Sequence, residues 1–146
     1  MSLNKKIGIV IVDHGSRLEP SNRMLEEVAN LFAKRFAAQY EIVEPAHMEL
    51  AEPSIATAFA KCAARGAYRV VICPFFLGPG KHWTQDIPRL TADAAAKHPG
   101  VAYHVAPTLG IDDLILDLLN KRAQHCIGCE YDCELCHGTL RAGKMD

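Results

Sequence analysis

The sequence lacks long hydrophobic runs and has almost no net charge. No apolar stretch approaches the roughly 20 residues that a membrane-spanning helix needs, so we expect no membrane anchor. With a formal net charge of −1, the protein as a whole has no electrostatic field that would attract nucleic acid or a lipid surface. Any anionic partner must therefore bind to local positive charge. With 49% hydrophobic residues among 146, the chain is expected to form one globular domain.

The beginning of the sequence does not have the pattern of an export signal. The apolar run after Lys5 and Lys6 has only six residues, closes on Asp13 and shows no cleavage site. We therefore predict a cytoplasmic protein, or one of an organelle interior such as that of a plastid.

Short runs rich in β-branched residues alternate with helical patterns. Strands are expected at 6–12, 40–44, 69–74 and 101–106. Helices are expected to begin near Pro20, Pro53, Asp86 and Asp112, with Asp86 as a capping residue. This order predicts an α/β fold, an open parallel sheet of about four strands with helices on both faces.

Two of these strands lead to a histidine. His14 follows the strand 6–12 at once, and His82 closes the loop that leaves the strand 69–74. Parallel strands end at one edge of the sheet, where ligands bind, and two imidazoles facing one pocket suit Fe, Co, Ni or Zn. A strand-end histidine is more often structural, but Asp13 is placed to orient His14 and Gly15 to open the backbone beside it.

The loop before His82 is predicted to line the same pocket. Gly78 and Gly80 let the backbone approach a flat ligand, Pro79 stiffens the loop, and Lys81 offers a positive charge.

The second strand contributes two further polar residues to this edge. His47 and Glu49 lie two positions apart on an extended chain, so both are expected to face the pocket, although Glu49 also fits a solvated carboxylate. No role is assigned to the four remaining histidines, which are His98, His104, His125 and His137.

Three motifs together resemble the small sirohydrochlorin chelatases of the CbiX/SirB type. They are Asp-His-Gly-Ser-Arg at 13–17, Glu-Leu-Ala-Glu-Pro-Ser at 49–54, and Pro-Phe-Phe-Leu-Gly-Pro-Gly-Lys-His at 74–82 followed by Asp-Ile-Pro at 86–88. The likeness covers residues 6–124. It implies insertion of Fe²⁺ or Co²⁺ into sirohydrochlorin, on the way to sirohaem or cobalamin. It also implies a homodimer, because the short form resembles one half of the longer two-lobed chelatases.

The same resemblance implies roles for individual residues. His14 and His82 correspond to the metal-handling pair, and His14 also to the proton acceptor. The implied contacts with the macrocycle are Glu49, Leu77, Gly78, Pro79, Gly80, Lys81 and His82.

Four of the six cysteines crowd into the end of the chain. Cys126, Cys129, Cys133 and Cys136 form two Cys-x2-Cys pairs, which predict a metal site, because zinc and iron–sulfur clusters both accept four cysteines. Disulfides are the alternative. The pattern resembles the C-termini of plant and cyanobacterial sirohydrochlorin ferrochelatases, which carry an iron–sulfur cluster, and this favours a cluster here and Fe²⁺ as the substrate metal. We thus expect a chelatase domain at 4–124 and a cysteine-rich tail at 125–146.

Two other functions remain open from the residues. A non-enzymatic carrier of Fe, Co or Ni could use the same histidines and cysteines, although the Gly-Pro-Gly loop would then have no task. A histidine followed by glycine after a first strand also occurs in phosphoglycerate-mutase-like phosphatases, but these need arginine before the histidine, where Asp13 stands.

Overall fold

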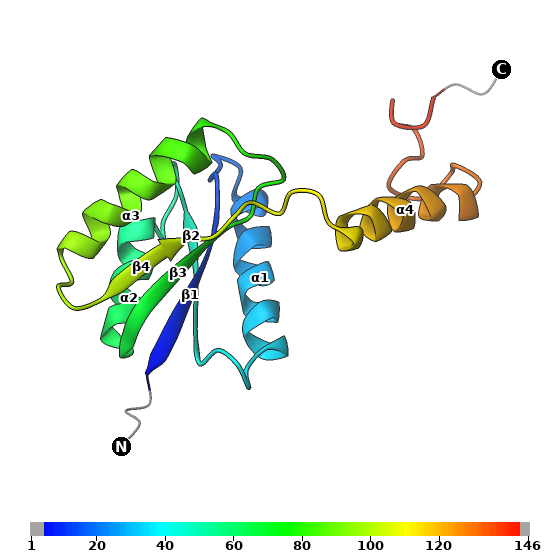
Figure 1. The fold of residues 1–146 in the computed structure, drawn as a ribbon. Helices are drawn as coiled ribbons and strands as arrows, with labels where there is room; N and C mark the ends of the chain where they lie inside the picture. Colours follow the sequence, from blue (N-terminus) through cyan, green and yellow to red (C-terminus); the bar gives the residue numbers. More distant parts are fainter. Residues whose placement is uncertain (1–4, 144–146) are drawn as a thin grey trace. The chain divides into compact units, whose positions relative to one another are not determined.

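The computed structural model describes residues 5–143 and contains one four-stranded parallel sheet (Figure 1). The strands β1 (Lys6–Asp13), β2 (Ile42–His47), β3 (Ala67–Pro74) and β4 (Ala102–Val105) lie in the order β2-β1-β3-β4. The helices are α1 (Glu19–Arg35), α2 (Ile55–Ala64), α3 (Ile87–Ala96) and α4 (Asp113–Gly128), with a π-helix η1 (His82–Asp86) directly before α3. The predicted α/β fold with a four-stranded parallel sheet is confirmed.

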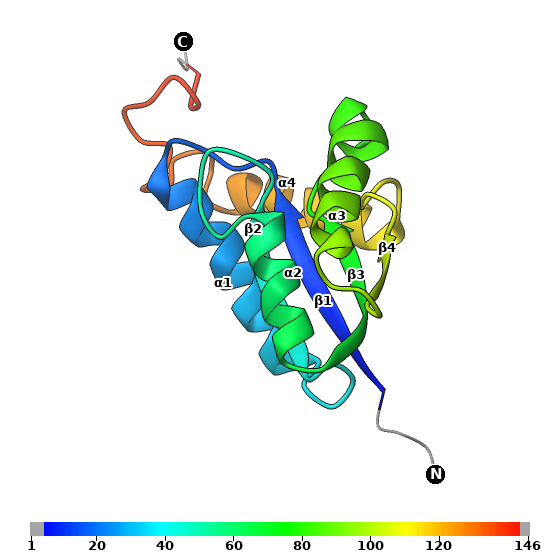
Figure 2. The same ribbon diagram turned by 90° about the vertical axis from the view of Figure 1, so that its left-hand side faces the viewer.

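Helices cover both faces of the sheet, as predicted. On one face, Leu25 and Ala29 of α1 pack against Ile9 and Ile11 of β1. The alternate residues of β1 pack on the other face with residues of α2 and α3, which lie in front of the sheet in Figure 2. Because β1 is buried on both faces, its sequence is a continuous apolar run without polar alternation.

The packing of β1 against α2 depends on a glycine. A Cβ on Gly8 would lie 2.9 Å from the Cβ of Cys62, so no larger side chain fits there without a shift. Cys62 is fully buried, and this burial raises the pKa of its thiol to about 12. Cys73 is half-buried, and burial raises its pKa as well. Neither thiol has the environment of a reactive cysteine.

The edge strand β2 differs most from its prediction. It was expected at residues 40–44 but runs from Ile42 to His47, through Pro45. Proline has no backbone N–H and therefore often marks the end of a strand, but an edge strand such as β2 pairs on one side only and tolerates proline where the N–H would face away from the neighbouring strand.

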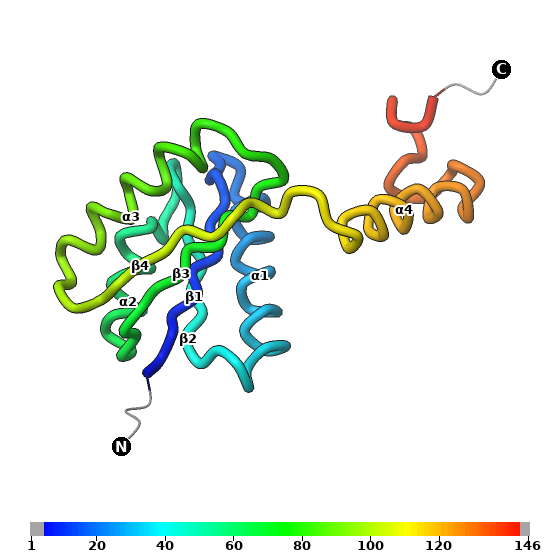
Figure 3. The backbone as a smooth tube through the Cα atoms, viewed as in Figure 1, coloured from blue at the N-terminus to red at the C-terminus, as the bar shows by residue number. Residues whose placement is uncertain are grey.

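The sheet has a topological switch point between β1 and β3. From β1 the chain moves to β2 on one side and then to β3 on the other. Asp13 pairs with His47 and Val12 pairs with Pro74, so three strands end level with one another. The tube in Figure 3 shows the loops after β1 and β3 leaving at this same end of the sheet. Ligands of open α/β sheets bind at such a point.

The chain forms two compact units, Met1–Gly110 with the sheet and Ile111–Asp146 with α4. The Asp112 side chain caps α4 by accepting a hydrogen bond from the Leu114 N–H at 2.9 Å. Within the described part of this unit, no other residues cover the leucines of α4, of which Leu114 is 75% and Leu119 64% accessible. The boundary at residue 124 stays a prediction.

Between residues 5 and 143, no helix combines the length and the apolar character that crossing a membrane requires.

Candidate functional site

The two predicted histidines meet at the switch point. His14 Nε2 and His82 Nε2 are 3.0 Å apart, although 68 positions separate the residues in the sequence. Their rings are nearly perpendicular, with centroids 4.5 Å apart, and roughly half of each side chain is exposed. Two nitrogens that bind one tetrahedral metal ion through bonds of ~2.1 Å lie about 3.4 Å apart. The pair therefore matches a metal site with only small movements.

The other ring nitrogen of each histidine already has an acceptor. His82 Nδ1 donates to Asp86 Oδ2 at 2.8 Å, and His14 Nδ1 donates to the Gly15 carbonyl at 3.3 Å. With both Nδ1 atoms assigned as donors, the two neutral rings point Nε2 lone pairs at each other. Two lone pairs at 3.0 Å repel unless a cation lies between them. The arrangement favours one shared proton or one metal ion.

The π-helix η1 positions His82. Its wider turn is followed directly by α3, and the Trp83 indole N–H anchors it by donating to the Ala106 carbonyl at 3.0 Å. Asp86 was predicted to cap α3, and this is wrong, because its backbone is already helical and its side chain caps no N–H group. The carboxylate instead orients His82 and lies 3.7 Å from Arg89 Nη2.

A glycine with a left-handed backbone positions His14 beside Glu49. Gly15 has φ +89°, and a Cβ there would lie 1.8 Å from the Glu49 carbonyl oxygen. The loops after β1 and β2 are joined at this point, because the Glu49 N–H donates to the His14 carbonyl at 3.2 Å. The Glu49 carboxylate lies 3.7 Å from His14 Nε2. Glu49 is therefore close enough to stabilise a positive charge on that ring.

Asp13 does not orient His14 as the sequence predicted. Its Oδ1 accepts from the Gly15 N–H at 3.0 Å and from His47 Nδ1 at 2.7 Å. His47 was expected to face the pocket but is fully buried, because it pairs with Asp13 in the sheet. Among residues 5–143 its Nε2 has no hydrogen-bond partner, and Glu26 Oε1 lies 3.8 Å from it. Asp13 and His47 thus hold the backbone of the loop that carries His14 without contacting its ring.

The loop from Leu77 to Lys81 lies exposed beside the histidines. Leu77 is 66% accessible, and a Cβ on Gly78 or Gly80 would meet nothing within 4 Å. The base of the loop is fixed, since the Leu77 carbonyl accepts from the Gly110 N–H at 2.7 Å. An exposed apolar side chain beside glycines, whose backbone is not screened by side chains, suits contact with a planar ligand.

Positive charge is available next to the His14 loop. Arg17 and Arg23 line a cavity of about 270 Å³ between the start of α1 and the loop after β2, but Glu19, Glu26 and Glu52 line it as well, so the cavity is not positive as a whole. Lys81 is exposed on the other loop. Individual cations such as Arg17 and Lys81 are therefore the local charges that an anionic ligand could meet.

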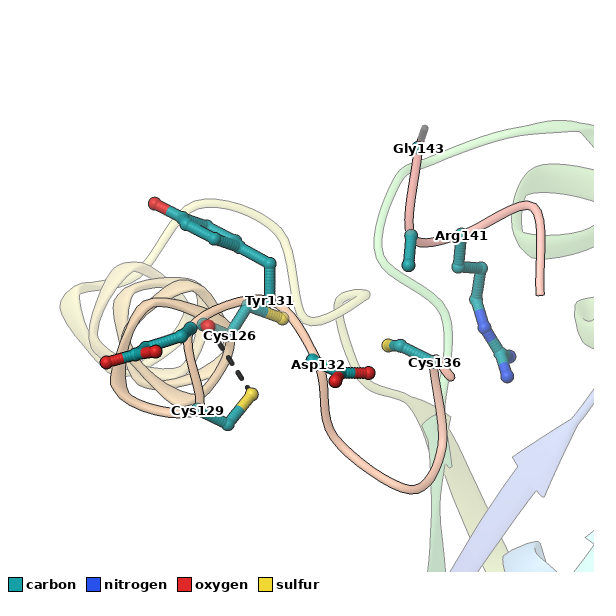
Figure 4. Close-up of a pocket in the computed structure, with 9 residues that line it drawn as sticks. Cys126, Cys129, Tyr131, Asp132, Cys136, Arg141 and Gly143 are labelled. Carbon is teal, nitrogen blue, oxygen red and sulfur yellow. Dashed lines mark hydrogen bonds between the residues drawn. The ribbon is translucent and has the colours of Figure 1, made fainter. Parts of the chain in front are cut away.

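The cysteine tail forms a pocket of its own. Cys126, Cys129 and Cys136 line a cavity of about 550 Å³, and their sulfurs turn toward one another in Figure 4. The pKa of Cys133 is lowered to about 7, mainly by a hydrogen bond with the Cys136 thiol and to a smaller extent by one with His125. Its partner Cys136 has a raised pKa, chiefly through the same bond with Cys133.

These thiols are expected to differ in reactivity. In reduced, metal-free protein at neutral pH, the lowered pKa gives Cys133 a larger thiolate fraction than Cys136, whose pKa is raised. Iodoacetamide should therefore alkylate Cys133 faster than Cys136. Peptide mass spectrometry over time measures both rates, and equal rates would contradict the assignment.

No role was predicted for His125, yet its ring lies with Cys129 and Cys133, and the ligand atoms of the three residues are all within 4.8 Å of one another. The available signal was the spacing of four residues on a helix, which places His125 and Cys129 on one side of α4.

The fold and the paired imidazoles define an α/β protein with two imidazoles at its switch point, in an arrangement that suits a transition metal. The family model described as CbiX matches residues 8–126. The chain therefore belongs to the CbiX family.

Individual relatives agree with this family. A chloroplastic sirohydrochlorin ferrochelatase of Arabidopsis thaliana is 54% identical over 136 residues, which are 90% of this chain and 60% of that protein. A sirohydrochlorin cobaltochelatase of Methanosarcina barkeri is 30% identical over 134 residues, covering 86% of this chain and all of that protein. The structure of SirB from Bacillus subtilis with Fe³⁺ matches with a TM-score of 0.68 and 28% identity, covering 80% of this chain and 46% of that one. This chain thus spans 60% of the Arabidopsis relative and about half of SirB.

Proposed function

We propose that this protein is a sirohydrochlorin chelatase, a lyase-class enzyme that inserts a divalent metal ion into sirohydrochlorin for sirohaem or cobalamin synthesis. The observation that carries the proposal is the pair of Nε2 atoms 3.0 Å apart at the switch point. Fe²⁺ is the favoured substrate metal, because the ferrochelatase from Arabidopsis shares 54% identity and the cobaltochelatase from Methanosarcina barkeri shares 30%. Co²⁺ is the second choice.

Metal insertion needs a site that strips water from the ion and then releases it. Two neutral imidazoles, His14 and His82, can replace part of the hydration shell, yet they bind less tightly than a closed set of four ligands. This moderate affinity favours transfer to the macrocycle. Asp86 keeps His82 in the tautomer whose Nε2 is free to bind the ion.

The reaction must also remove two pyrrole protons. His14 Nε2 is the proposed acceptor of one of them, because a neutral imidazole accepts a proton near pH 7, and its lone pair becomes free for this once the ion has moved to the macrocycle. The second proton leaves to water. The Glu49 carboxylate, 3.7 Å away, stabilises the imidazolium that forms. The proposed contacts with the macrocycle face are Glu49, Leu77, Gly78, Pro79, Gly80, Lys81 and His82. Arg17 and Lys81 are proposed to bind its acidic side chains.

The alternative functions predict different stoichiometry. A metal carrier binds ions without consuming sirohydrochlorin. A phosphatase would have to bind a phosphate next to the carboxylate of Asp13, which repels it. Incubation of the protein with excess sirohydrochlorin and Fe²⁺ or Co²⁺ distinguishes them, because only an enzyme forms many products per chain.

We propose residues 4–124 as the chelatase domain and 125–146 as the tail. The chloroplastic relative supports a plastid interior as the location, with the cytoplasm as the alternative.

The protein is predicted to be a homodimer. One sheet edge gives a large flat ligand a single wall, and a symmetric partner would add a second. The chain covers 46% of SirB, as one lobe of a two-lobed chelatase would. Sedimentation at micromolar concentration should give twice the mass of the chain. A monomer with full activity would contradict this prediction.

The tail is predicted to hold an iron–sulfur cluster on Cys126, Cys129, Cys133 and Cys136 that metal insertion does not require. The four thiolates bind metal tightly, which suits structure or sensing better than transfer. Anaerobic purification should yield iron and acid-labile sulfide, and a variant truncated after Gln124 should keep chelatase activity. Zinc without sulfide would contradict the cluster, and an inactive but folded truncated dimer would contradict its dispensability.

A further inference from the structure

The end of α4 brings a histidine into ligand distance of two tail cysteines. His125, Cys129 and Cys133 each offer one ligand atom, and these atoms all lie within 4.8 Å of one another. Cys129 is the C-cap of α4 and follows His125 by one helical turn, so the two side chains are neighbours at the end of the helix. Cys133 follows the helix end and has to return to it.

The backbone after α4 makes this return. Glu130 and Tyr131 have left-handed φ angles of 54° and 63°, which non-glycine residues adopt at a cost of about 1 kcal/mol or more each. The Tyr131 N–H donates to the Cys126 carbonyl at 2.8 Å, and the Asp132 N–H donates to the Cys129 carbonyl at 3.1 Å. These bonds close the helix and reverse the chain, so the third ligand arrives from outside the helix.

We propose that His125, Cys129 and Cys133 bind one divalent transition-metal ion. An imidazole with two thiolates suits Zn²⁺, Fe²⁺ or Co²⁺ and disfavours Mg²⁺ or Ca²⁺, which prefer oxygen ligands. Three protein ligands of a tetrahedral ion leave the fourth position to water, so the ion stays exchangeable. This site uses none of the residues at the switch point.

The new site shares ligands with the proposed iron–sulfur cluster. Cys129 and Cys133 belong to both sets, whereas His125 belongs to the single-ion site and Cys126 and Cys136 to the cluster. A shared thiolate cannot serve both at once, so a single ion and a cluster exclude each other in one tail. The single-ion site rests on its own geometry, and only this exclusion depends on the proposed cluster.

The tail provides a matched control histidine. His137 is next to Cys136 in the sequence, but its Nδ1 pairs with Asp132 Oδ1 at 2.7 Å and it lies outside the three-residue group. Replacing His137 removes an equally exposed imidazole without removing a proposed ligand. Cys126 is the matched control thiol, since it neighbours His125 and is likewise outside the group.

Binding of Co²⁺ to the reduced, cluster-free full chain tests the proposal. Co²⁺ bound to thiolates gives a near-ultraviolet charge-transfer band, which two imidazoles at the switch point do not give. A His14→Ala/His82→Ala background removes that second site in every sample. We expect one thiolate-bound Co²⁺ per chain, at least ten-fold weaker binding in His125→Ala, and unchanged binding in His137→Ala and Cys126→Ser.

The outcomes separate the single-ion site from the cluster. His125→Ala lies on an exposed helix position where alanine favours the helix, and circular dichroism checks that α4 is retained. Unchanged Co²⁺ affinity in His125→Ala would overturn the proposal, as would equal losses in Cys126→Ser and His125→Ala. After anaerobic iron and sulfide reconstitution, we expect Cys126→Ser to lose the cluster but His125→Ala to keep it. A chain that held both a cluster and a thiolate-bound Co²⁺ would overturn the exclusion.

Discussion

Replacing His14 with alanine should abolish metal insertion while the fold survives. His14 lies on a loop at the strand end and is about half exposed, so its removal costs little core packing. It takes away a metal ligand and the proton acceptor together, and loss of a general base alone typically costs 10²–10⁴-fold in rate. His82→Ala, which leaves His14 in place, should also lose at least about 10²-fold by this reasoning.

The control for both variants is His104→Ala. His104 is an exposed histidine of β4 without a role at the switch point, so its variant should keep full activity. Steady-state turnover measures activity, and circular dichroism checks the fold. Near-wild-type turnover by a folded His14 or His82 variant would remove that histidine from the mechanism.

Replacing Gly15 with alanine is expected to be as damaging by a different route. The added Cβ would lie 1.8 Å from the Glu49 carbonyl oxygen, and the φ of +89° is itself unfavourable for alanine. The loops after β1 and β2 must separate, which moves His14 away from Glu49. We expect a loss of about 2 kcal/mol or more in the free energy of unfolding, a Tm lower by ~5 °C or more, and a severe loss of turnover.

Gly78→Ala is the matched test. Gly78 lies in the same candidate site, but a Cβ there meets no atom within 4 Å. Its Tm should stay within about 2 °C of the wild type, because surface changes of this kind stay near 0.5 kcal/mol. Equal Tm values for Gly15→Ala and Gly78→Ala would show that the close approach at Gly15 is not what holds the site.

The fold was predictable because the buried strands carry their signal locally. A strand covered on both faces by helices is apolar where it is covered, so β1 and the part of β3 that follows the exposed Arg69 were recognised without knowledge of their neighbours. The end of β2 was not, because Pro45 resembles a strand end until β2 is known to be an edge strand.

The meeting of His14 and His82 was likewise predictable from topology, since parallel strands end at one edge. The partners of these residues were not predictable. Asp13 precedes His14 in the sequence yet bonds to His47 across the sheet, and Asp86 resembles a helix cap yet orients His82. His125 was missed because its ligand partner Cys133 approaches only after the chain reverses at Glu130 and Tyr131.

Multiple-turnover metallation of sirohydrochlorin tests the proposed function most directly. The full chain, at a concentration well below that of sirohydrochlorin and Fe²⁺, is followed by the absorbance change on metal insertion, with the His14→Ala/His82→Ala protein as the background rate. The proposed mechanism predicts many metallated products per chain from the wild type and none above background from the double variant. Product formation that stops at one per chain, or equal rates for the two proteins, would contradict an enzyme that works through the histidine pair.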